Sequence, residues 1–233
     1  MQITRFGELD YQAGEAINTL CANLSFLGGD YKKILITSCH PQEGKSFISM
    51  NLMRAFAALG LRVVLVDADI RASALRSTYG INVQTNGDKK YLGLSGYLVG
   101  RCGIGDILGK TSIPGAYMIL AGVNVTKSLP LFNSPRMGEL LEALSGSFDI
   151  VLVDTPPVGT LIDAAQIATL CSGTLFVVRS GHTGSGELAQ AIEQIEKTGC
   201  PVIGTCSTAP RNGCTAKSIT TIPTRAGRAI LRI

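Results

Sequence analysis

Short runs of apolar residues alternate along this chain with longer stretches in which apolar residues recur every three or four positions. The short runs are rich in Val, Ile and Leu, which is typical of strands buried on both faces of a parallel sheet. The three- and four-residue recurrence is typical of amphipathic helices that pack on such a sheet. The alternation predicts an α/β domain with a mostly parallel sheet flanked by helices.

The same pattern gives expected bounds for each element. Strands are expected at 34–38, 61–67, 117–121, 148–154, 173–178 and 202–206. Helices are expected at about 8–27, 44–60, 93–100, 136–145, 161–170 and 185–197, with one further turn at 104–108. The segment 73–90 is polar and contains glycine, so it is expected to be irregular, and the prolines between 130 and 135 are expected to break the chain.

A single domain is expected to span residues 1–207, followed by a tail at 208–233 without a strand pattern. The end of this tail, IPTRAGRAILRI, separates apolar residues from arginines if it forms a helix. One face would hold Ile222, Ala226, Ala229, Ile230 and Ile233, and the other Arg225, Arg228 and Arg232. A basic amphipathic helix of this kind would suit an anionic membrane surface or an acidic partner. The alternatives are a terminal helix docked on the domain and a disordered tail.

Composition narrows the class of protein. A chain of 233 residues with 45% hydrophobic and 16% charged residues can bury about 70% of its unfolded surface in one core. It has no run of 18 apolar residues, and its first residues lack an export signal, so a cytoplasmic location is expected. The seven cysteines form no CxxC pair, which favours reduced thiols. A net charge of +4 is too mild to indicate nucleic acid, and none is expected as a partner.

A phosphate-binding loop is predicted at 34–46, ILITSCHPQEGKS. A β-branched run ends there in a polar turn, and Gly44, Lys45 and Ser46 open an amphipathic helix. Backbone N–H groups at a helix start are unpaired and carry partial positive charge, so they can bind phosphate oxygens. Lys45 would reach the β- and γ-phosphates, and the Ser46 hydroxyl would bind Mg²⁺. One position departs from the GxxxxGK[ST] pattern, because Cys39 stands where the first glycine is expected.

Carboxylates end the two strongest predicted strands. Asp67 ends one, with Asp69 two residues further on, and Asp154 ends the other. Because ligands bind outside the carboxyl ends of parallel strands, these side chains should meet Lys45 and Ser46 at one Mg–nucleotide site. Carboxylates there can hold the metal through its waters, and one of them can take a proton from an attacking hydroxyl.

Three segments carry a resemblance to a known family. TSCHPQEGKSFISMNL, VVLVDADIRASAL and FDIVLVDTPPV resemble the nucleotide motifs of the bacterial tyrosine kinases of capsular and exopolysaccharide synthesis, which are P-loop ATPases of the deviant Walker A type. The resemblance covers roughly residues 10–207. It implies an ATP-dependent protein-tyrosine kinase that uses Mg²⁺, with ATPase activity as the fallback.

The resemblance also implies roles for individual residues. The catalytic set would be Lys45, Asp67, Asp69 and Asp154, and the metal set Ser46, Asp67, Asp69 and Asp154. The ATP-binding set would be Cys39, His40, Pro41, Gln42, Glu43, Gly44, Lys45, Ser46, Phe47 and Arg71. Expected partners are ATP and ADP, a tyrosine-bearing protein substrate, a second copy of the chain, and a transmembrane polysaccharide co-polymerase that activates the kinase and recruits it to the inner face of the membrane.

The chain departs from the family at two places that bear on the loop and on assembly. Gln42 stands where the family often has glycine, which is tolerable if the backbone there needs no positive φ. The family's Glu-x-x-Arg-x-x-Arg subunit-contact pattern falls on Glu15, Asn18 and Cys21, and only the glutamate matches. The sequence therefore indicates ring assembly less strongly than it indicates nucleotide binding.

The C-terminal tyrosine cluster of the family is absent, because no tyrosine follows Tyr117. The acceptor would then lie on another chain or among internal tyrosines such as Tyr79, Tyr91 and Tyr97. Two other functions stay open from the sequence. One is a partitioning or septum-positioning ATPase, although its signature lysine is replaced by His40. The other is a nucleotide-binding regulatory protein without kinase turnover.

Overall fold

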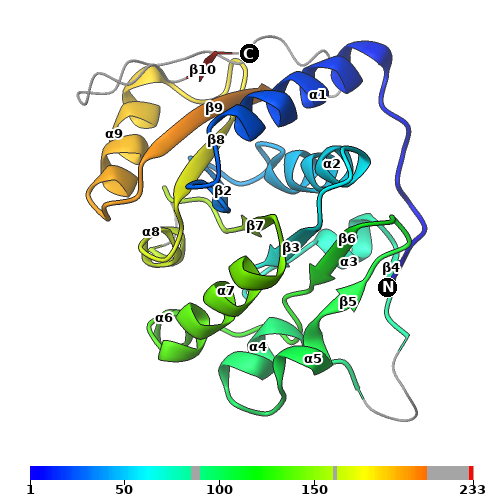
Figure 1. Ribbon diagram of the computed structural model, residues 1–233. Coiled ribbons are helices and arrows are strands. Elements are labelled where there is room, and N and C mark those ends of the chain that lie inside the picture. Colours follow the sequence, from blue (N-terminus) through cyan, green and yellow to red (C-terminus); the bar gives the residue numbers. More distant parts are fainter. Residues whose placement is uncertain (85–89, 160–161, 209–230, 233) are drawn as a thin grey trace.

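The computed structural model describes residues 1–84, 90–159, 162–208 and 231–232, and its centre is a twisted eight-stranded sheet (Figure 1). The strand order is β10-β9-β8-β2-β7-β3-β6-β5. The bounds of these strands are β2 Lys33–Ser38, β3 Val63–Asp67, β5 Gly109–Lys110, β6 Ala116–Ile119, β7 Ile150–Asp154, β8 Gly173–Arg179, β9 Val202–Thr208 and β10 Leu231–Arg232. A separate antiparallel pair joins β1 (Gln2–Ile3) to β4 (Ile81–Asn82).

The described helices cover both faces of this sheet. They are α1 Tyr11–Phe26, α2 Lys45–Ala58, α3 Leu75–Thr78, α4 Gly93–Leu98, α5 Ile104–Ile107, α6 Leu129–Phe132, α7 Pro135–Ser147, α8 Asp163–Ala168 and α9 Ser185–Glu196. Helices α1 and α2 share one hydrophobic cluster with one face, whereas α4 to α9 share a second cluster with the other. Alternate residues of a strand enter different clusters: Leu35 joins the second, and Ile34 and Ile36 the first. Burial on both faces explains why the strands are continuous apolar runs.

All neighbouring strands of the large sheet are parallel except β5 and β6. The predicted fold class, a mostly parallel sheet flanked by helices, is therefore confirmed. The register places Asp67 at the end of β3 directly beside Asp154 at the end of β7. Strand β2, which leads into the phosphate loop, is the other neighbour of β7. The three strand ends singled out from the sequence thus lie side by side at one edge.

Several elements differ from the expectation. The prolines near 130 and 135 begin helices α6 and α7, because the first helical turn needs no N–H from proline. The antiparallel edge strand β5 was not predicted, and the segment 73–90 contains α3 and β4.

The tail also departs from its prediction, because Leu231–Arg232 pair with β9 as strand β10 and do not end a helix. The rest of the predicted helix, and its relation to a membrane, lies outside the described residues. Within the described part of the chain, no helix combines the length and apolar character needed to cross a membrane.

Candidate active site

A cavity of about 1000 Å³ opens at the carboxyl edge of the sheet. The segment 41–48 lines it, together with the ends of β3 and β7, the residues that follow them, and one side of α1. Its lining includes the predicted side chains Lys45, Ser46, Asp67, Asp69 and Asp154. The structure therefore brings the predicted catalytic and metal residues together around one space. Such a position is where open parallel sheets bind their ligands.

The loop between β2 and α2 has the geometry of an anion cradle. Gly44 adopts φ 94° before the first residue of α2, so the chain turns sharply into the helix. A Cβ on Gly44 would come 3.0 Å from Thr208, so a side chain there would be both strained and crowded. The first N–H groups of α2 have no partner within the helix, and they lie at the cavity. Together they offer the donors that phosphate oxygens require.

Gln42 is the non-glycine residue with positive φ in the described part of the chain, at 61°. The condition under which glutamine is tolerated here without strain, a backbone without positive φ, is therefore not met. A left-handed conformation costs a residue with a Cβ roughly 1–2 kcal/mol. The loop consequently holds a strained residue that the surrounding structure has to stabilise.

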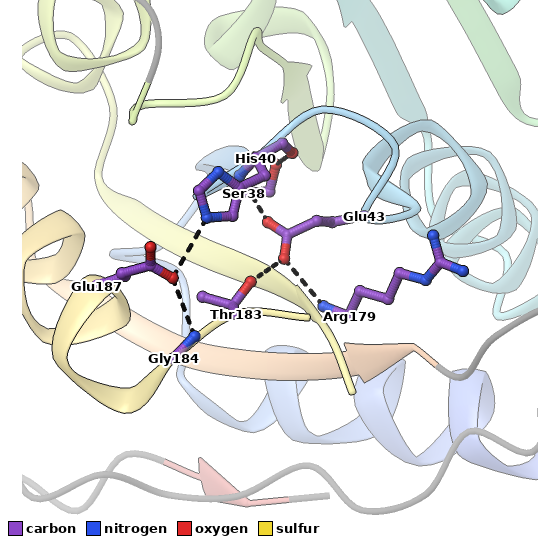
Figure 2. Close-up of polar contacts among 7 residues, drawn as sticks. All are labelled: Ser38, His40, Glu43, Arg179, Thr183, Gly184 and Glu187. Atoms are coloured by element: carbon purple, nitrogen blue, oxygen red, sulfur yellow. Dashed lines mark hydrogen bonds and ion pairs between the residues drawn. The ribbon is translucent and has the colours of Figure 1, made fainter. Parts of the chain in front are cut away.

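Glu43 supplies that stabilisation through a buried carboxylate, which Figure 2 shows at the centre of its contacts. One carboxylate oxygen accepts a hydrogen bond from the His40 N–H at 2.8 Å. The other accepts from the Arg179 N–H at 3.1 Å and from the Thr183 hydroxyl. The Thr208 hydroxyl also donates to the Glu43 carbonyl at 2.8 Å. We call the three carboxylate contacts the Glu43 brace, because they tie the phosphate loop to the end of β8 and the turn before α9.

The two residues at the start of the loop, Cys39 and His40, do not line the cavity. Cys39 is buried, and burial, with the nearby Glu43 charge, raises the pKa of its thiol to about 12. It is therefore a packed thiol and a poor nucleophile. The His40 ring lies 3.4 Å from the Glu187 carboxylate (Figure 2). It also meets the His182 ring edge-on, at 5.5 Å between centroids. ATP binding by Cys39 and His40 would have to use backbone atoms.

Lys45 and Ser46 meet the strand ends directly. The Lys45 ammonium donates to the Ser38 hydroxyl at 3.0 Å. Burial lowers the Lys45 pKa, and the Asp154 charge opposes part of that shift. The Ser46 hydroxyl donates to Asp154 Oδ2 at 2.7 Å. This contact joins the start of α2 to the end of β7, two elements about a hundred residues apart.

Asp67 and Asp154 are both buried carboxyl groups with raised pKa values. Burial raises the pKa of Asp67 to about 8 and that of Asp154 to about 6. Asp67 Oδ2 accepts from the Ser73 hydroxyl and from the Ala121 N–H at 3.4 Å. Asp69 is partly exposed, and its Oδ1 accepts from the N–H of residue 72 at 3.0 Å. Asp67 and Asp69, which lie two residues apart, therefore differ in solvent access.

A magnesium ion fits the donor set of this site. Oδ1 of Asp67 and Oδ1 of Asp154 are both buried oxygens without a hydrogen-bond partner, and the Ser46 hydroxyl lies against Asp154. Mg²⁺ prefers oxygen ligands and usually keeps several waters beside one or two carboxylates and substrate phosphates. In the described ranges no cluster of three His, Cys, Asp or Glu residues could hold a metal by itself. The site therefore suits an ion that arrives with a nucleotide better than a permanently bound one.

Arg71, predicted to bind ATP, lines the cavity but makes its strong contacts within the chain. Its Nε donates to Asp163 Oδ2 and to the Ser128 hydroxyl, both at 2.7 Å, and its Nη1 donates to the Thr126 carbonyl at 3.0 Å. Asp163 is fully buried at the start of α8. Arg71 thus ties the loop after β3 to α8, and a role in ATP binding stays a prediction.

The sequence did not identify the brace partners Arg179 and Thr183, nor Ser73 as the hydrogen-bond partner of Asp67. Their spacing from the motifs carries no periodic signal. On α1, Glu15 and Asn18 of the subunit-contact pattern are exposed and Cys21 is buried.

The internal tyrosines expected as acceptors are poorly placed. Tyr79 and Tyr97 are 8% and 4% exposed. The Tyr91 hydroxyl is partly buried and donates to the carbonyl of residue 107 at 2.7 Å. None of these three hydroxyl groups can reach a nucleotide on another molecule without local unfolding.

Comparisons with known proteins agree with this geometry. The AAA domain family matches residues 31–201. Tyrosine-protein kinase CpsD of Streptococcus agalactiae is 33% identical over 190 residues, which are 82% of this chain and 80% of the relative. The kinase domain of Escherichia coli tyrosine kinase ETK is 26% identical with a TM-score of 0.78, over 86% of this chain and 77% of that one. The septum site-determining protein MinD of Pyrococcus horikoshii, solved with Mg-ADP, is 22% identical with a TM-score of 0.60 over 74% and 68% of the two chains, a likeness of fold alone.

Proposed function

This chain belongs to the family of bacterial tyrosine-protein kinases that includes CpsD, and from that premise we propose that it transfers the γ-phosphoryl group of ATP to tyrosine, in the regulation of capsular or exopolysaccharide synthesis. One observation carries the proposal. Lys45, the Ser46–Asp154 hydrogen bond and the unpaired oxygens of Asp67 and Asp154 converge at the start of α2. Phosphoryl transfer needs such a set, because it depends on positioning and on neutralising charge at the phosphates.

Each of these residues has a role in phosphoryl transfer that follows from its surroundings. The N–H groups at the start of α2 and the Lys45 ammonium bind the β- and γ-phosphates. Ser46 and Asp154 would hold Mg²⁺, which supplies charge neutralisation between the phosphates when it is bound. Asp67 accepts the proton of the tyrosine hydroxyl when it is ionised. Its raised pKa makes the ionised form a stronger base than an exposed carboxylate, and it also means that only part of the Asp67 carboxyl is ionised at neutral pH. Asp69 lies nearer the solvent at the cavity edge and helps to orient the incoming hydroxyl.

The expected partners follow from the family. We propose that a transmembrane polysaccharide co-polymerase on a separate chain activates this kinase and recruits it from the cytoplasm to the inner face of the membrane. The proposal is supported by relatives named as tyrosine-protein kinases, one of them in a cps region.

The test is tyrosine phosphorylation of a synthetic Glu–Tyr polymer with Mg²⁺ and γ-labelled ATP, comparing wild type with Lys45→Met. Loss of the ammonium should lower the rate about 100-fold, because it removes a preorganised charge at the transferring phosphate. Lys32→Met, a change at an exposed lysine before β2, is the control and should behave as wild type. Phosphate release without phosphotyrosine would instead indicate a switch ATPase. Nucleotide binding without either product would indicate a regulatory protein.

A further inference from the structure

The six tyrosines of this chain all lie in the described part of the structure, and they differ sharply in solvent access. Tyr79 and Tyr97 are buried, and Tyr91 is partly buried with its hydroxyl on a backbone carbonyl. Tyr31 and Tyr117 are also partly buried, and the Tyr117 ring packs edge-on against another aromatic ring at 5.1 Å between centroids. A phosphoryl acceptor must bring its hydroxyl to about 3 Å from the γ-phosphorus, in line with the leaving oxygen. Tyr79 lines the cavity of its own chain but is only 8% exposed, and none of these five side chains is open enough to enter the cavity of another molecule without local unfolding.

Tyr11 is different, because 83% of it is exposed. It is the first residue of α1, and the helix start is fixed by the Asp10 carboxylate, which accepts from the Ala13 N–H at 2.7 Å. The neighbouring residues Glu8, Asp10 and Gln12 are exposed as well. The hydroxyl of Tyr11 is therefore presented on a well-formed but open surface.

The direction of Tyr11 excludes transfer within one molecule. Ala13, Ala16 and Ile17 line the nucleotide cavity from α1, whereas Tyr11 does not. Successive residues of a helix are about 100° apart, so residues 11 and 13 point to nearly opposite sides. Tyr11 thus faces away from the cavity of its own chain and can meet only the cavity of another molecule.

The molecule that offers this cavity is a second copy of the chain, because the cavity that holds ATP in the proposed function is the chain's own. Glu8, Asp10 and Glu15 are exposed carboxylates near Tyr11. The cavity is lined by cations and by carboxylates, with Lys45, Arg71 and Arg179 beside Glu43, Asp67, Asp69 and Asp154, so the exposure and direction of Tyr11, not charge, support this encounter.

We propose that Tyr11 is a phosphorylation site that one copy of the chain offers to the nucleotide cavity of another. The phenolic oxygen of Tyr11 attacks the γ-phosphorus, the bond from that phosphorus to the β–γ bridging oxygen breaks, and ADP leaves. The phenolic proton passes to Asp67 of the copy that holds ATP. The inference rests on the proposed kinase function, and the experiment below separates the two.

The test incubates the full chain with Mg²⁺ and ATP and maps phosphotyrosine by mass spectrometry in wild type, Tyr11→Phe and Tyr31→Phe. Tyr11→Phe should lose autophosphorylation while it still phosphorylates the Glu–Tyr polymer at the wild-type rate. Tyr31→Phe is the matched control and should keep both activities. A size-tagged Lys45→Met chain should receive phosphate on Tyr11 when it is mixed with wild type, because transfer occurs between molecules.

Each other outcome overturns the inference. Phosphate on a different tyrosine, or undiminished autophosphorylation of Tyr11→Phe, would show that Tyr11 is not the acceptor. Failure to label the tagged Lys45→Met chain would exclude transfer between copies. If wild type modifies the polymer but not itself, the kinase proposal stands and the Tyr11 inference fails. If wild type modifies neither, both fail.

Discussion

Removal of the Glu43 brace tests how the phosphate loop is held in its strained shape. In Glu43→Ala the N–H groups of His40 and Arg179 lose their carboxylate acceptor, and the Thr183 hydroxyl loses its partner. A buried donor left without an acceptor costs about 1–3 kcal/mol. The two N–H groups together therefore predict a free energy of unfolding lower by about 2–6 kcal/mol. Urea unfolding of the nucleotide-free protein, followed by circular dichroism, measures this quantity.

A second readout of the same variant is nucleotide affinity. Without the brace, Gln42 can leave its left-handed conformation and regain roughly 1–2 kcal/mol. Nucleotide binding must then restore the strained loop, so the Kd of a non-hydrolysable ATP analogue should rise about tenfold. Adding Gln42→Gly to Glu43→Ala should recover most of that affinity, because glycine adopts positive φ without the Cβ penalty. Titration calorimetry gives both dissociation constants.

Glu142→Ala is the control, because Glu142 is an exposed carboxylate that pairs with Lys33 at the surface. Surface ion pairs contribute about 0–1 kcal/mol, so this variant should unfold close to wild type. The reasoning is refuted if Glu43→Ala is no less stable than the control. It is also refuted if Gln42→Gly leaves the affinity of Glu43→Ala unchanged, since loop strain would then not be the reason for weak binding.

Two further variants test the buried ionic groups. In the nucleotide-free protein, burial raises the Asp67 pKa to about 8, so between about pH 4 and 8 the folded carboxyl keeps a proton that the unfolded one releases. The free energy of unfolding of wild type therefore falls as pH rises through this window. The free energy of unfolding of Asp67→Asn relative to wild type should increase from pH 4 to 8 and then level off. If the two proteins instead show the same dependence of unfolding free energy on pH, the Asp67 pKa is not raised. Arg71→Ala leaves the buried Asp163 carboxylate without its cation, and chemical denaturation should show a loss of about 3 kcal/mol. Arg71→Lys should lose less, and equal stability of Arg71→Ala and wild type would show that the ion pair is not stabilising.

The pattern of the sequence was enough to predict the central parallel strands and the main residues of the site, but not the edge strands β5 and β10. Apolar runs define strands buried on both faces, and the helical stretches between them force parallel connections. In a parallel sheet the carboxyl ends of the strands share one edge, so Asp67, Asp154 and Lys45 had to meet wherever the exact bounds fell. The register that pairs Asp67 with Asp154 agrees with that expectation. The resemblance to the tyrosine kinases then supplied a function that periodicity and spacing could not.

The tertiary structure alone decided which neighbours those residues have. Gln42 needs a positive φ because the loop is held by Glu43, whose partners Arg179 and Thr183 lie about 140 residues further along the chain. Arg71 meets Asp163 across a gap of 92 residues. Solvent access separates Tyr11 from the other tyrosines only after the helices have packed. Such contacts depend on how distant elements are placed side by side, and no local pattern of apolar and polar residues records that placement.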